Sequence, residues 1–193
     1  MLGKKPPSDT FQTLSLFSVE QGLVQGLQRV SRKATPLASL DLFDLASVLL
    51  EEGGQGHVCF LKEARLLQRH EGIGRSYETL RHASAFATLV ARNPVNEESR
   101  SAVFALLHQA FGAFSETERP EIVYFKSLYR FCRDEGYPLK QAWFQELPSH
   151  EREAAADLLN APVAGQTIDP KTVSRLLRKM EDYLRGHTEI QLE

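Results

Sequence analysis

The chain has 193 residues, of which 42% are hydrophobic and 25% are charged, and its net charge is −2 at pH 7. These values are ordinary for a globular protein, and the negative charge argues against a protein that coats nucleic acid over its whole surface. No apolar run approaches the roughly 18 residues of a membrane helix, and the N-terminal residues lack the apolar region of a secretory signal. The cysteines Cys59 and Cys132 lie far apart in apolar patterns, which predicts reduced, buried thiols in a cytoplasmic protein without a membrane partner.

Basic residues concentrate near the start of the chain. The first forty residues contain two acidic side chains and five basic ones, namely Lys4, Lys5, Arg29, Arg32 and Lys33. This asymmetry indicates an anionic partner for the N-terminal part.

Alternating apolar residues predict β-strands in the first seventy residues, over 10–18, 22–30, 39–51 and 57–67. The first two form a predicted hairpin that turns at residues 20–22, and glycines at 53–56 turn the chain again. A small antiparallel β-barrel is a natural way for such short strands to protect their edges. We therefore expect a barrel over residues 1–70.

From about residue 75 the apolar period becomes helical. Helices are predicted over 76–92, after a cap at Asn96, from Pro120 to Gly136, around Trp143, over 150–160, and after a cap at Asp169. The fold class predicted is α+β by domain, with an N-terminal OB-fold barrel over residues 1–70 and an all-α helical domain over residues 71–193.

Motif searches predict a protein that is not an enzyme. The sequence has no phosphate-binding P-loop, no metalloprotease or esterase motif and no paired C-x-x-C. The Gly72-Ile73-Gly74 segment lacks the third glycine of a dinucleotide loop, so a turn between the two domains is the better interpretation. We expect no catalytic residues, no cofactor and no metal site.

Three groups of residues are candidates for binding. Aromatic side chains at strand positions (Phe11, Phe17 and Phe43) are more often barrel core than base-stacking platforms. The basic segment from Arg29 to Lys33 is either a solvated loop or a phosphate contact. Lys126, Arg130 and Arg133 share one face of a predicted helix, which is either solvated and neutralised by nearby acids or a site for an acidic peptide with an apolar end.

The sequence resembles the RecO family of bacterial recombination mediators. "LSLFSVEQGLVQGLQRVSRK" is similar to that family's hairpin, in which an LFT-x-E-x-G turn leads to a basic segment. "LDLFDLASVLLE", "GQGHVCFLKEARLL", "FCRDEGYP" and "LLNAP" follow in the family's order along nearly the whole chain. On this match Arg29, Arg32 and Lys33 fall on the family's basic positions, while Val30 replaces its glycine.

The resemblance implies a DNA-binding protein with an N-terminal OB-fold and a helical domain. Such a protein binds single- and double-stranded DNA, promotes strand annealing, and acts with RecR to load RecA onto DNA coated with single-strand-binding protein (SSB). Its location would be cytoplasmic and associated with the nucleoid. The DNA-contacting residues would be Lys4, Lys5, Arg29, Arg32, Lys33 and Arg65, and the acidic, Phe-ending SSB tail would bind Lys126, Arg130 and Arg133.

Two departures and two alternatives accompany this resemblance. Many members carry a four-cysteine zinc module, whereas Trp143 stands near the position of its first cysteine here, so we predict no zinc. Little sequence precedes Lys4 to form the family's first strand. The alternatives are a protein-interaction adaptor of the same fold with little DNA binding, and an OB-type RNA binder.

Overall fold

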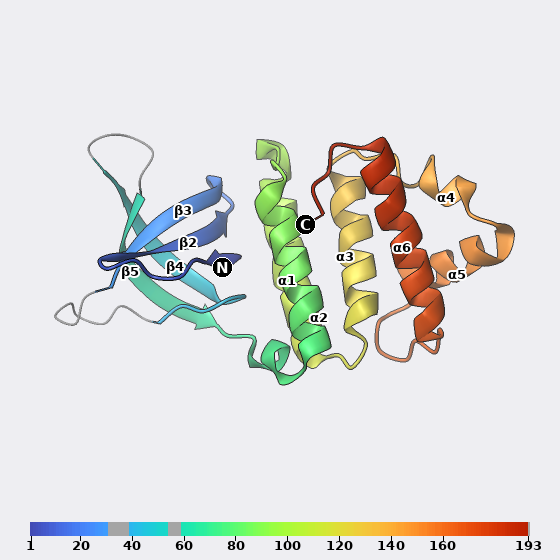
Figure 1. The fold of residues 1–193 in the computed structure, drawn as a ribbon, viewed down its shortest axis with the longest axis horizontal. Coiled ribbons are helices and arrows are strands. Elements are labelled where there is room, and N and C mark those ends of the chain that lie inside the picture. The colour runs from blue at the N-terminus through green and yellow to red at the C-terminus, as the bar shows by residue number, and fades with distance from the viewer. Residues whose placement is uncertain (31–38, 54–58, 193) are drawn as a thin grey trace.

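The computed structural model describes residues 1–30, 39–53 and 59–192. It is elongated, with a β-sheet at one end and a bundle of helices at the other (Figure 1). The predicted α+β fold class is therefore confirmed. None of the described helices is long and apolar enough to cross a membrane.

The described residues of the N-terminal half form a five-stranded mixed sheet with the order β1-β2-β3-β5-β4. Its strands are β1 (Gly3–Lys4), β2 (Phe11–Ser18), β3 (Gly22–Arg29), β4 (Leu45–Glu52) and β5 (Cys59–Gln68). Strands β2 and β3 form the predicted hairpin, and Gly22 takes a φ of 72° in its turn, a conformation that favours glycine. Strand β5 pairs with β4 antiparallel and with β3 parallel.

The expected barrel is not shown. The edge strands β1 and β4 share no hydrogen-bonded ladder over the described residues. Three hydrogen bonds join the start of the chain to the segment before β4. The Phe43 backbone N–H donates to the Met1 carbonyl at 2.9 Å, and the Met1 ammonium donates to the Asp44 carbonyl at 2.6 Å. Lys4 donates to the Leu40 carbonyl at 2.9 Å. The described sheet is nevertheless open, because its two edge strands are not paired with each other.

The strand predicted from residue 39 begins at Leu45, six residues late. Phe43 has a φ of 68°, which an extended strand does not allow. The Asp44 carboxylate accepts a hydrogen bond from the Asp41 N–H at 2.8 Å and closes a turn instead. Local alternation suggested a strand there, but this side-chain contact decides the conformation.

One face of the sheet encloses a small apolar core. Leu14 and Leu16 of β2 pack there with Leu40 and Leu61, and all four are buried. Because side chains alternate along a strand, the neighbouring residues point to the opposite, outer face. This outer face carries one of the candidate sites.

The helical half contains six α-helices and two short 3₁₀ turns. They are η1 (Glu71–Arg75), α1 (Tyr77–Arg92), η2 (Glu97–Ser99), α2 (Arg100–Glu116), α3 (Pro120–Asp134), α4 (Trp143–Glu146), α5 (Ser149–Asn160) and α6 (Pro170–His187). The predicted cap of the last helix is confirmed, because an Asp169 carboxylate oxygen accepts from the Thr172 N–H at 3.0 Å. Asn96 precedes η2 and forms no side-chain cap.

The core of the helical half extends into the sheet half. Phe43 packs against Phe111 of α2 with ring centroids 5.1 Å apart, and Leu2 belongs to the same buried cluster. The last strand ends at Gln68 and the first helical turn begins at Glu71. The two halves are therefore distinct in secondary structure but share a continuous apolar core.

A basic groove on α3 and the outer face of the sheet

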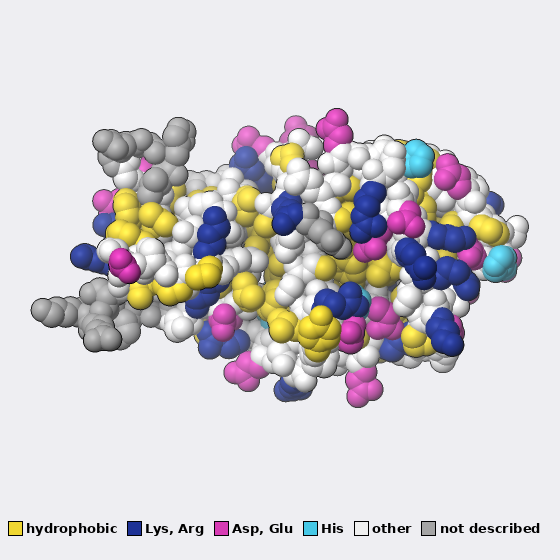
Figure 2. Space-filling model, viewed as in Figure 1, with side chains coloured by type: hydrophobic (Ala, Val, Ile, Leu, Met, Phe, Trp, Pro, Cys, Tyr) yellow, Lys and Arg dark blue, Asp and Glu magenta, His cyan; other side chains and the backbone are white. Residues whose placement is uncertain are grey.

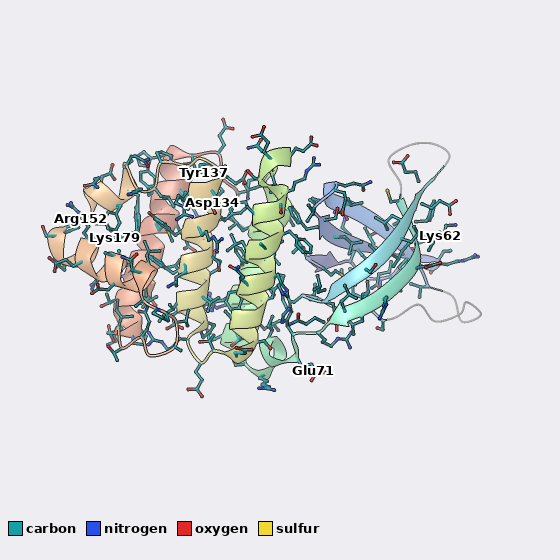
Figure 3. The ribbon with its side chains drawn as sticks, turned by 180° about the vertical axis from the view of Figure 1, so that it is seen from behind. Lys62, Glu71, Asp134, Tyr137, Arg152 and Lys179 are labelled. Atoms are coloured by element: carbon teal, nitrogen blue, oxygen red, sulfur yellow. The ribbon has the colours of Figure 1, made fainter. Side chains whose placement is uncertain are left out.

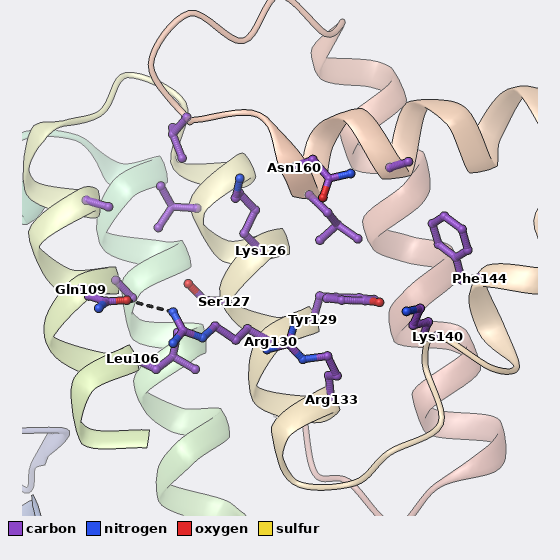
Figure 4. A pocket seen from close by; sticks show the side chains of 16 residues that line it. Leu106, Gln109, Lys126, Ser127, Tyr129, Arg130, Arg133, Lys140, Phe144 and Asn160 are labelled. Atoms are coloured by element: carbon purple, nitrogen blue, oxygen red, sulfur yellow. Dashed lines mark hydrogen bonds between the residues drawn. The ribbon is translucent and has the colours of Figure 1, made fainter. Parts of the chain in front are cut away.

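The predicted basic stripe on α3 lines a pocket of about 660 Å³ between α2, α3 and α5 (Figure 4). We call this pocket the α3 groove. Its apolar lining includes Leu106, Ala110, Ala113, Val123, Leu159 and Val163, and its polar lining includes Gln109, Lys126, Ser127, Tyr129, Arg130, Arg133, Lys140 and Asn160.

The groove is strongly cationic for its size. The three predicted side chains, Lys126, Arg130 and Arg133, all line it, and Lys140 adds a fourth positive charge. No Asp or Glu is among the residues that line it, although the whole chain has a net charge of −2. Four cations around an apolar surface form a site that attracts an anionic, partly apolar ligand.

Existing contacts orient the two arginines. Arg130 donates to the Gln109 side-chain oxygen at 2.9 Å and lies 3.6 Å from the Asp134 carboxylate. Arg133 donates to the other Asp134 oxygen at 2.6 Å. Asp134, labelled in Figure 3, does not line the groove. These contacts hold both guanidinium groups on α3 and leave them partly exposed, since about half of the Arg133 side chain is solvent-accessible.

Lys126 and Lys140 differ in what holds them. The Lys126 ammonium donates to the Ala161 carbonyl at 2.6 Å, at the C-terminal end of α5, and burial lowers its pKa from the ordinary value. Lys140 is exposed and makes no hydrogen bond or ion pair within the described chain. Lys126 is therefore partly structural, and Lys140 is the cation with most freedom to meet a ligand.

Sequence reasoning missed Lys140 and the aromatic end of the groove. Lys140 follows α3 in a connecting segment, so no helical period links it to Arg133. Tyr129 and Phe144 lie beside it (Figure 4), and burial raises the Tyr129 pKa while nearby Arg133 opposes that shift. The groove thus combines cations with an aromatic patch, which suits a short acidic peptide with an apolar end.

The outer face of the sheet carries an aromatic pair beside Arg29. Phe11 lies opposite Arg29 in the β2–β3 register, and its ring is 5.6 Å from that of Phe60. Leu27 lies opposite Phe60 in the parallel β3–β5 pair. Phe11 and Phe60 are half-buried, so part of each ring faces solvent. Aromatic rings next to a guanidinium are the elements with which open sheets bind single strands.

The three aromatic candidates predicted from the sequence lie in different places: two contact the core, and one is on the outer face. Phe43 is 5% exposed and belongs to the core. Phe17 packs against the same core. Phe11 lies on the outer face instead, with Phe60, which the sequence analysis did not single out. The alternation of β2 alone could not show which strand would lie next to Phe11.

The other residues predicted to contact DNA differ in their exposure and in their hydrogen-bond partners. Lys4 donates to the Leu40 carbonyl at 2.9 Å, which holds it against the turn before β4. Lys5 is exposed, and its backbone N–H donates to the Thr13 carbonyl at 2.9 Å. Arg65 is exposed on β5 opposite Ser47. Arg32 and Lys33 lie outside the described residues.

Charge on the sheet is mixed. Lys62 on β5 forms a 2.8 Å ion pair with Glu51 on β4, and Glu63 lies between Lys62 and Arg65 in sequence. Figure 2 shows basic and acidic side chains interspersed over the sheet half of that face. The described residues before η1 carry six Lys or Arg and seven Asp or Glu side chains, so the sheet part has no net positive charge, and Lys5 and Arg29 are exposed cations within it.

The His, Cys, Asp and Glu side chains of the described chain are dispersed. Among residues 1–30, 39–53 and 59–192, no three His, Cys, Asp or Glu side chains gather closely enough to hold a metal ion. Cys132 is fully buried, and burial raises its pKa well above the ordinary value. Cys59 is a free, half-buried thiol.

Comparison with models of known protein families gives no match, and no curated protein matches the chain.

Proposed function

We propose that this chain is a RecO-like, non-enzymatic mediator of DNA recombination and repair. It would bind single- and double-stranded DNA, promote strand annealing, and help to load RecA onto SSB-coated DNA together with RecR. The α3 groove carries the proposal. Four cations surround an apolar floor there without a lining carboxylate, in a chain with a net charge of −2.

The groove suits the partner that the RecO resemblance implies. The tail of SSB is acidic and ends in phenylalanine, so it offers carboxylates to Arg130, Arg133 and Lys140 and an aromatic ring to Tyr129 and Phe144. Charge-assisted hydrogen bonds to arginine are among the stronger polar contacts in proteins. The acidic part of such a peptide would contact the cations of the groove, and its aromatic end would contact the aromatic side chains.

The sheet supports the DNA-binding part of the proposal. An OB-fold is a partly open, five-stranded Greek-key barrel that binds oligonucleotides on its second and third strands. The order β1-β2-β3-β5-β4 and the contact between Met1 and Phe43 are compatible with such a barrel. Phe11, Phe60 and Arg29 lie on the outer face of that region.

The mixed charge of the sheet favours the adaptor as a second candidate. The ion pair between Lys62 and Glu51 leaves few free cations there for phosphate. An adaptor would keep the groove and bind its peptide partner without binding DNA. Measuring DNA affinity therefore distinguishes the mediator from the adaptor. Measuring peptide affinity tests the α3 groove, which both functions use.

Peptide binding tests the groove directly. A short fluorescent peptide with several aspartates and a C-terminal phenylalanine is titrated with the full chain, and anisotropy gives its Kd. We expect Lys140→Glu to weaken binding about tenfold, because an attractive contact becomes a repulsive one. Arg92→Glu is the matched control, since Arg92 is exposed at the end of α1 and does not line the groove.

The peptide itself supplies the second control. Replacing its terminal phenylalanine by alanine should weaken binding, because the aromatic contact with Tyr129 and Phe144 is lost. Equal affinity of the wild type and Lys140→Glu for the original, phenylalanine-ended peptide would contradict the proposal.

A further inference from the structure

A second basic surface lies on α6, away from both sites described above. We define the α6 basic face as Lys171, Arg175, Arg178 and Lys179, all of which are exposed. Lys171, Arg175 and Arg178 are spaced by four and three residues, so they share one side of the helix over about 10 Å. Figure 2 shows Lys and Arg side chains gathered along α6 on the helical half.

Few acids neutralise this face. Arg175 and Lys179 share one carboxylate, Glu151 of α5, at 3.1 Å and 2.5 Å. Glu151 is only 6% exposed, so it lies beneath the two cations and not between them and solvent. Lys171 and Arg178 make no hydrogen bond or ion pair within the described residues. The face therefore keeps a net positive charge, although the Asp169 carboxylate caps the N-terminal end of α6 and offsets the helix dipole there.

The cationic character ends farther along the helix. Arg185 lies 3.4 Å from Asp182 and 3.9 Å from Glu181, so two carboxylates offset one guanidinium there. The positive charge is thus confined to the first part of α6.

The chemistry of the face indicates a polyphosphate partner. The apolar residues of α6 face the core, where Val173, Leu176, Met180 and Leu184 are fully buried and Leu177 is partly buried. The helix therefore has no apolar side free to insert into a lipid surface. An acidic peptide has the apolar α3 groove available, whereas the α6 basic face offers it only exposed charge. Regularly spaced phosphates gain from each lysine and arginine by releasing bound counterions.

We propose that the α6 basic face binds the phosphodiester backbone of a second nucleic-acid strand while the first strand lies on the sheet. This inference rests on the proposed DNA-binding function of the sheet. Lys62 on the sheet and Lys179 on α6 lie at opposite ends of the molecule (Figure 3), so the two surfaces can hold two strands at once. A single chain would then bridge two strands without nucleotide hydrolysis.

Strand bridging by the full chain tests this inference. Two non-complementary single strands of about 30 nucleotides, one carrying a donor fluorophore and the other an acceptor, are mixed with protein at about 50 mM salt. Energy transfer reports bridging, and anisotropy of one strand alone reports binding. The test variant is Lys171→Glu with Arg178→Glu, because neither side chain has a partner whose loss would unfold the chain.

We expect this double variant to bind one strand within about twofold of the wild type and to lose bridging about tenfold. Arg75→Glu with Arg92→Glu is the control, since it makes the same change in net charge at exposed residues outside α6 and should still bridge. Urea unfolding midpoints equal to that of the wild type confirm that both variants are folded.

The outcomes separate the inference from the function on which it rests. Wild-type protein that binds no strand at low salt would overturn both. Wild-type protein that binds one strand but does not bridge, or equal bridging by the wild type and the α6 double variant, would overturn only the second surface.

Discussion

Gly72 lies directly against the backbone of Ser115, where the first turn of the helical half meets the end of α2. The Gly72 N–H donates to the Ser115 hydroxyl at 3.0 Å. A Cβ atom on Gly72 would overlap the Ser115 carbonyl oxygen. The turn predicted at Gly72-Ile73-Gly74 is present as η1, and Gly72 is needed in it for its close approach to α2.

Gly72→Ala should therefore lower the free energy of unfolding by about 2–4 kcal/mol, because the backbone of η1 or of α2 must shift to relieve the overlap. Gly74→Ala is the matched control, since it lies in the same turn and a Cβ there meets nothing within 4 Å. Urea unfolding of both variants measures the difference. Equal stability of the two variants would show that η1 is not held against α2.

Asp44 fixes the turn before β4. Its side chain is 1% exposed and accepts two hydrogen bonds from Arg69, at 3.1 Å and 2.8 Å, as well as the bond from Asp41. Asp44→Ala leaves these donors without their acceptor, and we expect a loss of about 2–4 kcal/mol in the free energy of unfolding.

Asp9→Ala is the control for Asp44, because Asp9 is exposed and makes no ion pair in the described chain. Thermal or urea unfolding measures both variants. A change in the Asp44 variant no larger than that of the control would mean that the turn does not depend on the carboxylate.

His82 should make stability depend on pH. It is 4% exposed, and burial lowers its pKa below the ordinary value, although the Glu78 carbonyl contact opposes this. At pH values below about 6.5, the unfolded chain binds a proton that the folded chain disfavours. The free energy of unfolding should therefore fall as the pH drops below that value.

His82→Gln removes this titration, so the variant should lose less stability than the wild type between about pH 7.5 and 5.5. Urea unfolding at both pH values gives the comparison, and His150→Gln, at an exposed site, is the control. The same loss in His82→Gln as in the wild type would assign the acid sensitivity to other groups.

The sequence predicted those elements that local patterns decide. The β2–β3 hairpin follows from alternation around Gly22, and α6 follows from the Asp169 cap and its apolar period. Contacts distant in sequence decide the rest. The parallel pairing of β3 with β5 and the hydrogen bonds from Arg69 to Asp44 have no local signal.

The candidate sites were likewise predictable only where their residues lie close together in sequence. Helical spacing placed Lys126, Arg130 and Arg133 on one face, and the structure puts that face in the α3 groove. Lys140 and Phe60 reach their sites from other segments, so no period could reveal them.

DNA binding by the full chain tests the central claim most directly. Anisotropy of a labelled single strand of about 30 nucleotides is measured at about 50 and 200 mM salt, for the wild type and for a variant with Arg29, Arg32 and Lys33 each changed to Glu. The same charge changes at Arg75, Arg81 and Arg92, which are exposed and belong to neither proposed nucleic-acid surface, provide the control. We predict binding that weakens at the higher salt and is lost in the first variant but not in the control. No binding by the wild type at the lower salt, or equal binding by the wild type and the first variant, would contradict the account.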